Sequence, residues 1–283
     1  MCVLWGVPYL LIKVAVREIS PAELVFVRSA LATVILLPIA LIRGEMRAAL
    51  RVWRPLLVYT LVEISLPWLL LSDAEQYVSS SLSGLVIAGV PLVAAVLVRL
   101  FDSDERLPPQ RLFGLLVGFS GVVVLLGFDS GVPGLTPVVE LAVVVVCYAV
   151  GPIIAGRWLA DAPNLAVVAG SLALSSLLYA PVVVPGMPEL ASRITARPAL
   201  AAVTLAVLCT ALAFVLFFAL IAEVGPARAT VFTFINPAVA VLLGAVVLDE
   251  RVTPVTAVAF GLILAGSVLA TRRNRADVAP AAV

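Results

Sequence analysis

Histidine is absent from this chain of 283 residues, and cysteine is scarce. Without histidine the sequence lacks the commonest metal ligand and the usual proton shuttle, so any proton-coupled chemistry must use carboxylates. The three cysteines, Cys2, Cys147 and Cys209, lie in apolar segments without CxxC spacing, and their odd number does not suit a disulfide framework. We interpret them as small buried side chains, and we expect neither a metal site nor a cofactor.

Charge is scarce as well. Only 12% of the residues are charged, against about a quarter in soluble domains, while 63% are apolar and the mean hydropathy is +1.19. The net charge of +1 and the lack of a basic patch with interleaved aromatic residues argue against nucleic acid as a partner. The sequence has no P-loop, no HExxH and no nucleophile elbow, so nothing in it resembles an enzyme. This composition indicates a membrane protein.

Long apolar stretches recur from one end of the chain to the other, separated by short loops that contain charges, proline or glycine. A bilayer core of about 30 Å needs about 20 helical residues to cross it, because a helix satisfies its own backbone hydrogen bonds where water is absent. The pattern predicts an all-α membrane protein with about ten transmembrane helices and the lipid bilayer around it. The predicted helices cover residues 2–16, 22–42, 53–71, 81–100, 109–126, 137–159, 165–184, 199–221, 227–248 and 254–270.

The first of these stretches is short. At 1.5 Å per residue, 15 residues reach only about 22 Å, so either the chain begins late or this helix starts inside the membrane. It does not read as a secretory signal, because the positive charges Lys13 and Arg17 follow the apolar run instead of preceding it.

Lysine and arginine in the loops predict the orientation. With ten helices both termini lie on one side, and that side carries twelve cations against five on the other. The excess predicts a cell-membrane protein with cytoplasmic termini. The twelve are Arg43, Arg47, Arg51, Arg54, Arg99, Arg106, Arg111, Arg157, Arg228, Arg272, Arg273 and Arg275. The five are Lys13, Arg17, Arg193, Arg197 and Arg251.

The two halves of the chain resemble each other. When Pro91 is placed on Pro237, IAGVPLVAAVL aligns with TFINPAVAVLL, the next segment DERLPP aligns with DERVTP after a one-residue slip, and Gly121 aligns with Gly266. A repeat of five helices is odd in number, so the second copy must enter the membrane inverted, which is the architecture of secondary transporters. The predicted domains are a five-helix repeat over 1–130, a second over 131–273, and a disordered cytoplasmic tail over 274–283.

These residues resemble the EamA-like branch of the drug/metabolite transporter superfamily. The resemblance rests on the WGVPYLLIK start, on PAELVFVRSA, and on a doubled pattern of in-helix proline, acidic loop residue and glycine-rich final helix. It implies a ten-helix exporter or importer of small metabolites that does not hydrolyse ATP and has a central cavity between its halves. The doubled pattern consists of Pro91, Asp104 or Glu105, Gly114, Gly118 and Gly121, and then of Pro237, Glu250, Gly261 and Gly266.

Three charged side chains, Lys13, Arg28 and Glu63, fall within or close to predicted helices. Each costs about 2.5–3.5 kcal/mol at a helix centre, so each must face a partner or water. One interpretation is an internal ion pair or a side chain that reaches the interface, for which Lys13 is the best candidate because it lies near its helix end. The other is a cationic cavity for a carboxylate or phosphate, with Glu63 as the counter-charge. The approximate repeat positions, Gly156 and Ser171, carry no charge, which favours the second interpretation.

Glu63 is the candidate for proton coupling, because it is the only acidic residue well inside a predicted helix. Burial would favour its protonated form, whereas a nearby Arg28 would favour the ionised form. The sequence leaves both open.

Prolines and a few polar or aromatic residues complete the candidate site. The helix-breaking prolines free backbone carbonyls, either as packing kinks or at a cavity. An asparagine in an apolar run must find a partner, and the aromatic residues can wall a cavity or anchor at the interface. The hinge candidates are Pro8, Pro67, Pro91, Pro152 and Pro237. The predicted cavity residues are Lys13, Arg28, Glu63, Trp5, Trp68, Tyr148 and Asn236.

Two further features have alternative interpretations. Gly114 and Gly118 form a GxxxG that serves close helix packing, either within the fold or at a homodimer face. The acidic residues that end helices at loops are either solvated interface carboxylates or gating partners of nearby arginines. They are Asp104, Glu105, Asp249 and Glu250.

The function that these features predict is secondary-active transport of small metabolites or drugs, as an exporter, by alternating access between the two repeats. The alternative is a membrane-embedded lipid-handling protein or enzyme with an apolar core. That alternative requires a polar catalytic cluster at one interface, and the sequence offers none.

Overall fold

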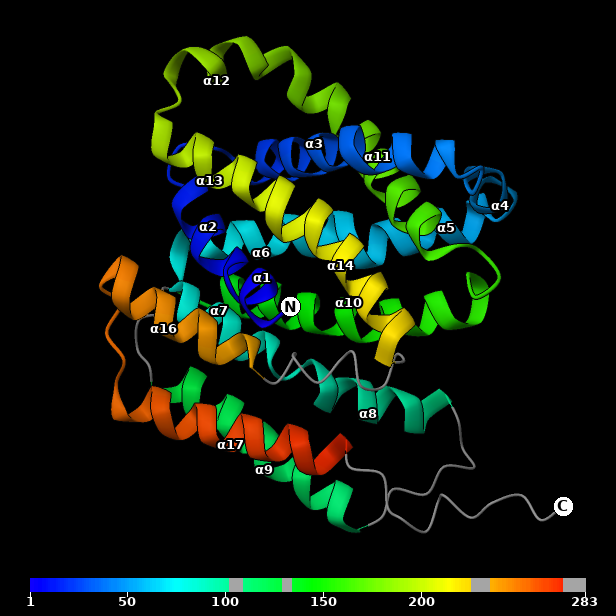
Figure 1. Cartoon of the computed structure of the whole chain (residues 1–283). Helices are drawn as coiled ribbons and strands as arrows, with labels where there is room; N and C mark the ends of the chain where they lie inside the picture. The colour runs from blue at the N-terminus through cyan, green and yellow to red at the C-terminus, as the bar shows by residue number, and fades with distance from the viewer. Residues whose placement is uncertain (102–108, 129–133, 225–234, 272–283) are drawn as a thin grey trace, which may run out of the picture.

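The structure, a computed structural model, describes residues 1–101, 109–128, 134–224 and 235–271. All regular structure in these residues is helical (Figure 1). Six helices are long and apolar enough to cross a membrane, and four shorter apolar helices account for the rest of the ten predicted segments. The prediction of an all-α membrane protein is confirmed. Asp104, Glu105, the start of the segment at 227–248 and the tail 274–283 lie outside the described residues.

The first half begins with a broken helix and ends with a continuous one. Short helices replace the first, third and fourth predicted segments, because each of these is interrupted. The elements are α1 (Cys2–Gly6), α2 (Pro8–Ala15), α3 (Pro21–Ile42), α4 (Met46–Arg51), α5 (Trp53–Tyr59), the π-helix η1 (Thr60–Ser65), α6 (Leu66–Tyr77), α7 (Ser80–Ile87), α8 (Val90–Phe101) and α9 (Pro109–Phe128).

The second half repeats this order. Its third segment again contains a π-helix, while its first segment is continuous through Pro152. The elements are α10 (Thr136–Trp158), α11 (Asn164–Val183), the 3-10 helix η2 (Val184–Gly186), α12 (Met187–Arg193), α13 (Ala196–Ala206), the π-helix η3 (Val207–Leu212), α14 (Ala213–Val224), α16 (Asn236–Leu248) and α17 (Pro254–Thr271).

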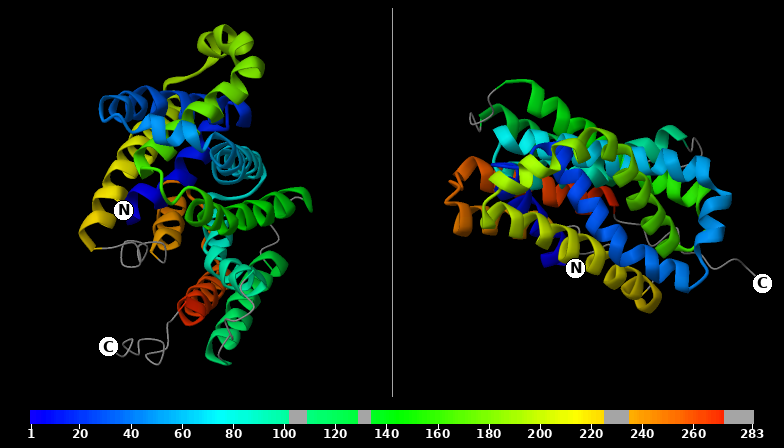
Figure 2. Two further views of the ribbon diagram at one scale, coloured as in Figure 1. Left: turned by 90° about the vertical axis from the view of Figure 1, so that its right-hand side faces the viewer. Right: turned by 90° about the horizontal axis from the view of Figure 1, so that it is seen from above.

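Equivalent helices of the two halves run in opposite directions. In Figure 1, α3 runs from left to right and its counterpart α11 from right to left, and α5 to α6 likewise opposes α13 to α14. Helices of one half also pack on helices of the other, since α9 contacts α17, α3 contacts α11, and α7 contacts α16. The halves therefore interlock as expected for an inverted duplication. Figure 2 shows from two more sides how the helices of both halves are interleaved.

The two π-helices occupy equivalent places in the repeat. The offset between Pro91 and Pro237 is 146 residues, which takes Glu63 of η1 to Cys209 of η3. A π-helix leaves carbonyl groups without their usual partners, and single-turn π segments often mark functional sites. Side chains donate to backbone carbonyls at both places: Tyr179 donates its hydroxyl to Ser65 O at 3.0 Å, and Thr210 donates to Leu205 O at 2.9 Å.

The third helix extends further than the sequence predicts. It continues to Tyr77 instead of ending at residue 71, so it includes Glu75, which is 0% exposed. The helix therefore has a further acidic residue, buried near its end and beyond the span that the sequence predicts. The polar residues of this last turn and a half lowered the apparent hydropathy, but neighbouring helices bury one face of the helix there.

The GxxxG of α9 is used inside the fold. A Cβ atom on Gly266 of α17 would overlap Gly118 N, Gly118 Cα and Gly114 O, so the two backbones meet at these glycines. This contact decides between the two interpretations of the motif. It gives no support to a homodimer face there.

We expect Gly266→Ala to lower the stability of the protein by about 2 kcal/mol, because backbone atoms of α9 must move to make room for a methyl group. Gly261→Ala is the matched control on the same helix, since nothing lies within 4 Å of a Cβ there. Thermal unfolding of both variants in detergent measures the difference. Equal melting temperatures would show that the α9–α17 contact tolerates a wider spacing.

Candidate functional site

A cavity of about 310 Å³ lies between the two halves. The first half contributes α1 to α3, η1, α6, α7 and α8, and the second contributes α10, α14, α16 and α17. Six of the seven predicted cavity residues line it: Trp5, Arg28, Glu63, Trp68, Tyr148 and Asn236. Three of the five predicted hinge prolines also line it: Pro8, Pro91 and Pro237.

Interruptions of helices meet at this cavity. The break between α1 and α2 precedes Pro8, the break between α7 and α8 precedes Pro91, and α16 begins one residue before Pro237. The carbonyl freed at Ala88 accepts a hydrogen bond from the hydroxyl of Ser267 in the other half, at 3.2 Å. Irregular backbone at membrane depth is tolerated where protein or a cavity satisfies it.

Arg28 is the cationic centre of the cavity. Its side chain is only 8% exposed, and its guanidinium carbon lies 3.5 Å from the ring centroid of Trp68. Nε donates to the hydroxyl of Thr210 at 2.8 Å. Within the described part of the chain no carboxylate pairs with Arg28, and its terminal amino groups make no hydrogen bond. Of the described residues, it is thus the neutral side chains of Thr210 and Trp68 that hold the guanidinium in place.

The π-helix η3 positions Arg28 across the interface between the halves. The Thr210 hydroxyl donates to Leu205 O, five residues earlier in the chain, and so presents its lone pair to Arg28 Nε. The sequence analysis missed Thr210, since only the folded structure brings residues 28 and 210 together.

Glu63 is the second charged residue of the cavity. It lies on η1, and its Oε2 atom is buried without a hydrogen-bond partner among the described residues. A Cβ on Gly151 of α10 would collide with its carboxyl group, so this glycine makes room for Glu63. The predicted ion pair between Glu63 and Arg28 is not among the contacts of either side chain.

Aromatic rings form much of the wall. Trp5 packs against Phe214 with ring centroids 5.7 Å apart and against Phe217 at 4.9 Å. Trp68 covers the guanidinium of Arg28 and is itself buried. The sequence analysis missed several lining residues, because apolar and aromatic residues are common in every segment. These are Tyr9, Phe214, Phe260 and Leu264.

Lys13 does not line the cavity. Its ammonium group donates to the carbonyl oxygens of Glu75 at 2.6 Å, Val78 at 2.8 Å and Gln76 at 3.5 Å, so it caps the end of α6. A cation at a helix C-terminus is favourable for the unpaired carbonyls and for the helix dipole. Pro67 and Pro152 are also outside the lining. The predicted pair of cations in the cavity is thus reduced to Arg28.

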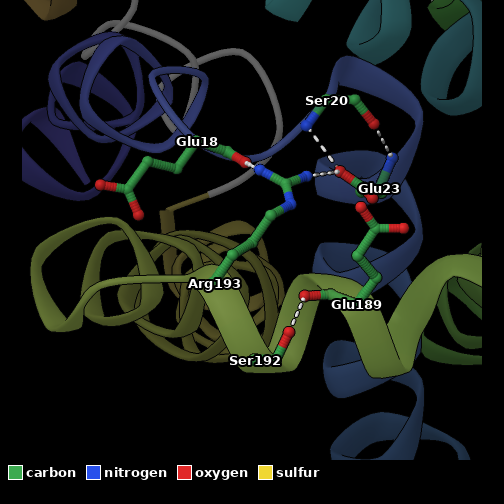
Figure 3. Close-up of polar contacts among 6 residues, drawn as sticks. All are labelled: Glu18, Ser20, Glu23, Glu189, Ser192 and Arg193. Carbon is green, nitrogen blue, oxygen red and sulfur yellow. Dashed lines mark hydrogen bonds and ion pairs between the residues drawn. The ribbon is translucent and has the colours of Figure 1, made fainter.

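Polar contacts join the halves beyond one end of the cavity. We call this the Lys13 end: α2 and α6 end there and α3, α7 and α13 begin there, on the left of Figure 1. Arg193 donates to Glu18 O at 2.6 Å and lies 3.7 Å from the carboxylate of Glu23, and Figure 3 shows it between them. Glu23 also accepts from Ser20 N at 2.7 Å.

Glu18 makes a second contact between the halves at the Lys13 end. Its carboxylate accepts the backbone N–H and the hydroxyl of Thr195, both at 2.7 Å. These hydrogen bonds hold the pKa of Glu18 below its usual range, the backbone bond contributing most. A lowered pKa means that the contact persists at neutral pH and is lost as the pH falls through that lowered value.

Comparison with known proteins gives a consistent result. The sequence profile described as "EamA-like transporter family" matches residues 1–127 and 137–272. The chain is 29% identical over 279 residues to the uncharacterized inner membrane transporter YedA of Escherichia coli K12, covering 95% of this chain and 87% of YedA. It is 24% identical over 276 residues to an uncharacterized transporter of Archaeoglobus fulgidus, covering 95% of each chain.

A solved structure supports the fold. A crystal structure of a protein 24% identical in sequence matches with a TM-score of 0.66 and covers 95% of this chain and 94% of that chain. At this level of identity the likeness concerns the arrangement of the helices alone.

Proposed function

This chain belongs to the EamA-like transporter family, and from that premise we propose that it is a secondary-active carrier of small organic anions. It would act by alternating access through the cavity between its two halves, as an exporter in the cell membrane with both termini in the cytoplasm. That its relatives are named membrane transporters supports a transport function without enzymatic chemistry.

One observation carries the choice of an anion. Arg28 lines the cavity, is 8% exposed, and has only neutral partners among the described residues. A buried cation without a counter-charge is costly, and an anionic ligand removes that cost. The guanidinium presents parallel N–H donors that suit a carboxylate or a phosphate in a bidentate geometry.

The broken helices support alternating access. In many secondary transporters the substrate binds near the bilayer midplane, at discontinuous helices between inverted repeats. Here the breaks before Pro8 and Pro91 and the start of α16 at Asn236 all border the same cavity. Helix segments on either side of such a break can move separately, which lets one end of the cavity open while the other is closed.

Transport by the purified protein in liposomes tests the proposal. We expect protein-dependent flux of at least one small carboxylate or phosphate compound from a panel of amino acids, organic acids, sugar phosphates and cationic drugs. Protein-free liposomes are the control. Flux of cationic drugs alone, or no flux of any compound, would contradict the proposal. Protein-dependent movement of lipid without metabolite flux would favour the lipid-handling alternative.

We expect Glu63→Gln to abolish accumulation of substrate against a gradient while leaving folding and counter-exchange largely intact. Glu63 supplies a carboxyl group to the lining of the cavity. Glutamine keeps the size of this side chain but cannot release a proton. Uptake driven by an imposed pH gradient, compared with exchange in its absence, separates the two effects. Glu189→Gln, an exposed carboxylate on α12, is the control. Full pH-driven accumulation in Glu63→Gln would exclude a coupling role for this residue.

A further inference from the structure

A layer of polar side chains closes the cavity at the Lys13 end. The cavity lining on α2, α6 and α7 reaches Ile12, Leu71 and Gly84. On the same three helices, Lys13, Glu75 and three serines, Ser80, Ser81 and Ser83, lie directly beyond it. A Cβ on Gly84 would meet Ala240 Cβ of α16 at 2.6 Å, so the two halves are in tight contact at this level.

Glu250 of the second half binds to this layer through residues of the first half. Its carboxylate accepts four hydrogen bonds at the start of α7: from Ser80 N at 2.8 Å, Ser80 Oγ at 2.9 Å, Ser81 N at 3.0 Å and Ser81 Oγ at 2.5 Å. Negative charge at a helix N-terminus is favourable for its unpaired N–H groups. Of the two interpretations of Glu250, solvated carboxylate or gating residue, this geometry supports gating, with serines in place of arginine.

The backbone before Glu250 directs its side chain to α7. Asp249, which follows the last residue of α16, adopts a left-handed conformation with φ of 55°. Glu250 N donates to Gly244 O at 3.0 Å, so the backbone of Glu250 stays close to the last turn of α16. A Cβ on Gly244 would collide with Glu250 Oε2 and Ser81 Oγ. The contact between the halves thus depends on a glycine and on a residue with positive φ, both in the second half.

Glu75 is the unexplained member of the layer. It is 0% exposed, and neither of its carboxyl oxygens makes a hydrogen bond of normal geometry among the described residues, although Ser83 lies beside it. Lys13 is near, but its ammonium donates to backbone carbonyls. An ionised carboxylate in such a place would be desolvated without compensation, which is a large cost.

Among the residues that the structure describes, the surroundings of Glu75 supply no cation besides Lys13. Lys13 on α2 and Glu250 behind α16 are the charged groups that act on it, α2 also contributes Tyr9, and α7 contributes serines. Glu140 of α10 interacts with Asp73 instead. On α3, Arg28 is held at the cavity by Thr210 and Trp68. Since both carboxyl oxygens of Glu250 accept hydrogen bonds from the donors at the start of α7, these donors are not available to a negative charge on Glu75.

We propose that Glu75 is a proton-binding site that controls the gate at the Lys13 end. With the gate closed, as in this structure, the carboxyl group carries the proton. Opening separates Glu250 from the start of α7 and admits water, and the proton then passes from Glu75 to water at this end. This inference rests on the proposed alternating access, but it concerns the gate and not the substrate.

The distance across the gate tests the proposal without any substrate. Tyr77 and Val252 are exposed positions on either side of the layer, one in each half. Spin labels on cysteines introduced there, in a background with the three native cysteines replaced by alanine, report the closed and open populations in nanodiscs by pulsed electron paramagnetic resonance. The measurement runs from about pH 5 to pH 9, and one linked proton changes the population ratio tenfold per pH unit.

We expect the open population to grow with rising pH with a slope approaching tenfold per unit. Glu75→Gln should stay closed at every pH, since glutamine cannot ionise, and Glu75→Met serves as a second neutral variant should glutamine impair folding. Glu250→Gln should shift the population towards open while retaining the slope. Glu189→Gln, an exposed carboxylate outside the cavity, should retain both the slope and the midpoint.

A wild-type slope in both neutral variants of Glu75, or no pH dependence in the wild type, would overturn the proposal. A population shift caused by sodium at constant pH, in place of the proton effect, would overturn it as well, because the site would then bind a metal cation. The gate measurement is independent of flux. Failure of the anion panel would refute the proposed substrate class, while a gate unaffected by Glu75 would refute only this inference.

Discussion

Arg28→Gln is expected to reduce transport of a carboxylate substrate by about 10-fold to 100-fold while reducing transport of a neutral analogue much less. A hydrogen bond to a charged group contributes about 1.5–3 kcal/mol, and each 1.4 kcal/mol corresponds to a factor of ten. In the wild type the guanidinium is desolvated and has no carboxylate partner among the described residues, so an anion gains this interaction in full. Flux of paired anionic and neutral compounds in liposomes measures the ratio.

Two control variants separate substrate recognition from support of the fold. Arg28→Lys keeps the charge but loses the planar fork, so we expect an intermediate loss for the anion. Thr210→Val removes the acceptor that holds Nε and keeps the charge. It should weaken binding through the position of the guanidinium, with the preference for anions retained. Equal losses for anionic and neutral compounds in Arg28→Gln would show that Arg28 holds the two halves together and does not recognise the substrate.

The positions of the helices could be predicted from hydropathy alone, because the bilayer imposes a length and a composition on each crossing. The helix predicted at 137–159 is observed at Thr136–Trp158, and the one predicted at 254–270 at Pro254–Thr271. The duplication could also be predicted, since proline, acidic residue and glycine keep their order in both halves. Short helices outside these segments, α4 and α12, were missed because they are not apolar enough to stand out.

The candidate site was predictable in part, for an energetic reason. Charged and amide side chains in apolar runs must find protein partners or water, and Arg28, Glu63 and Asn236 all border the cavity. The same reasoning misplaced Lys13, because a cation near a helix end can serve the carbonyls of a neighbouring helix equally well.

Contacts between distant residues could not be predicted. Glu250 meets Ser80 across 170 residues, and Arg28 meets Thr210 across 182. Neither pairing has a local signal, and the π-helix that presents Thr210 is not marked by proline or glycine. Glu75 was missed for a related reason: its turn of helix reads as polar, and only the packing of helices from both halves against α6 makes it buried.

Gly151→Ala is expected to cost about 3 kcal/mol of stability and to abolish transport, because the new methyl group would occupy the place of the Glu63 carboxyl. Gly156→Ala is the matched control on the same helix. Nothing lies within 4 Å of a Cβ there, so alanine should be neutral or stabilise the helix by up to about 1 kcal/mol. Thermal unfolding in detergent and flux in liposomes measure both effects.

A double-mutant cycle assigns the effect of Gly151→Ala to Glu63. In Glu63→Ala the carboxyl group is gone, so the methyl group on residue 151 has room, and adding Gly151→Ala should cost much less than it does in the wild type. Residues in contact show coupling energies of about 0.5–3 kcal/mol, whereas independent sites add within about 0.5 kcal/mol. Additive losses in the double variant would mean that Gly151 serves the packing of α10 in general, and that the place of Glu63 in the cavity does not depend on it.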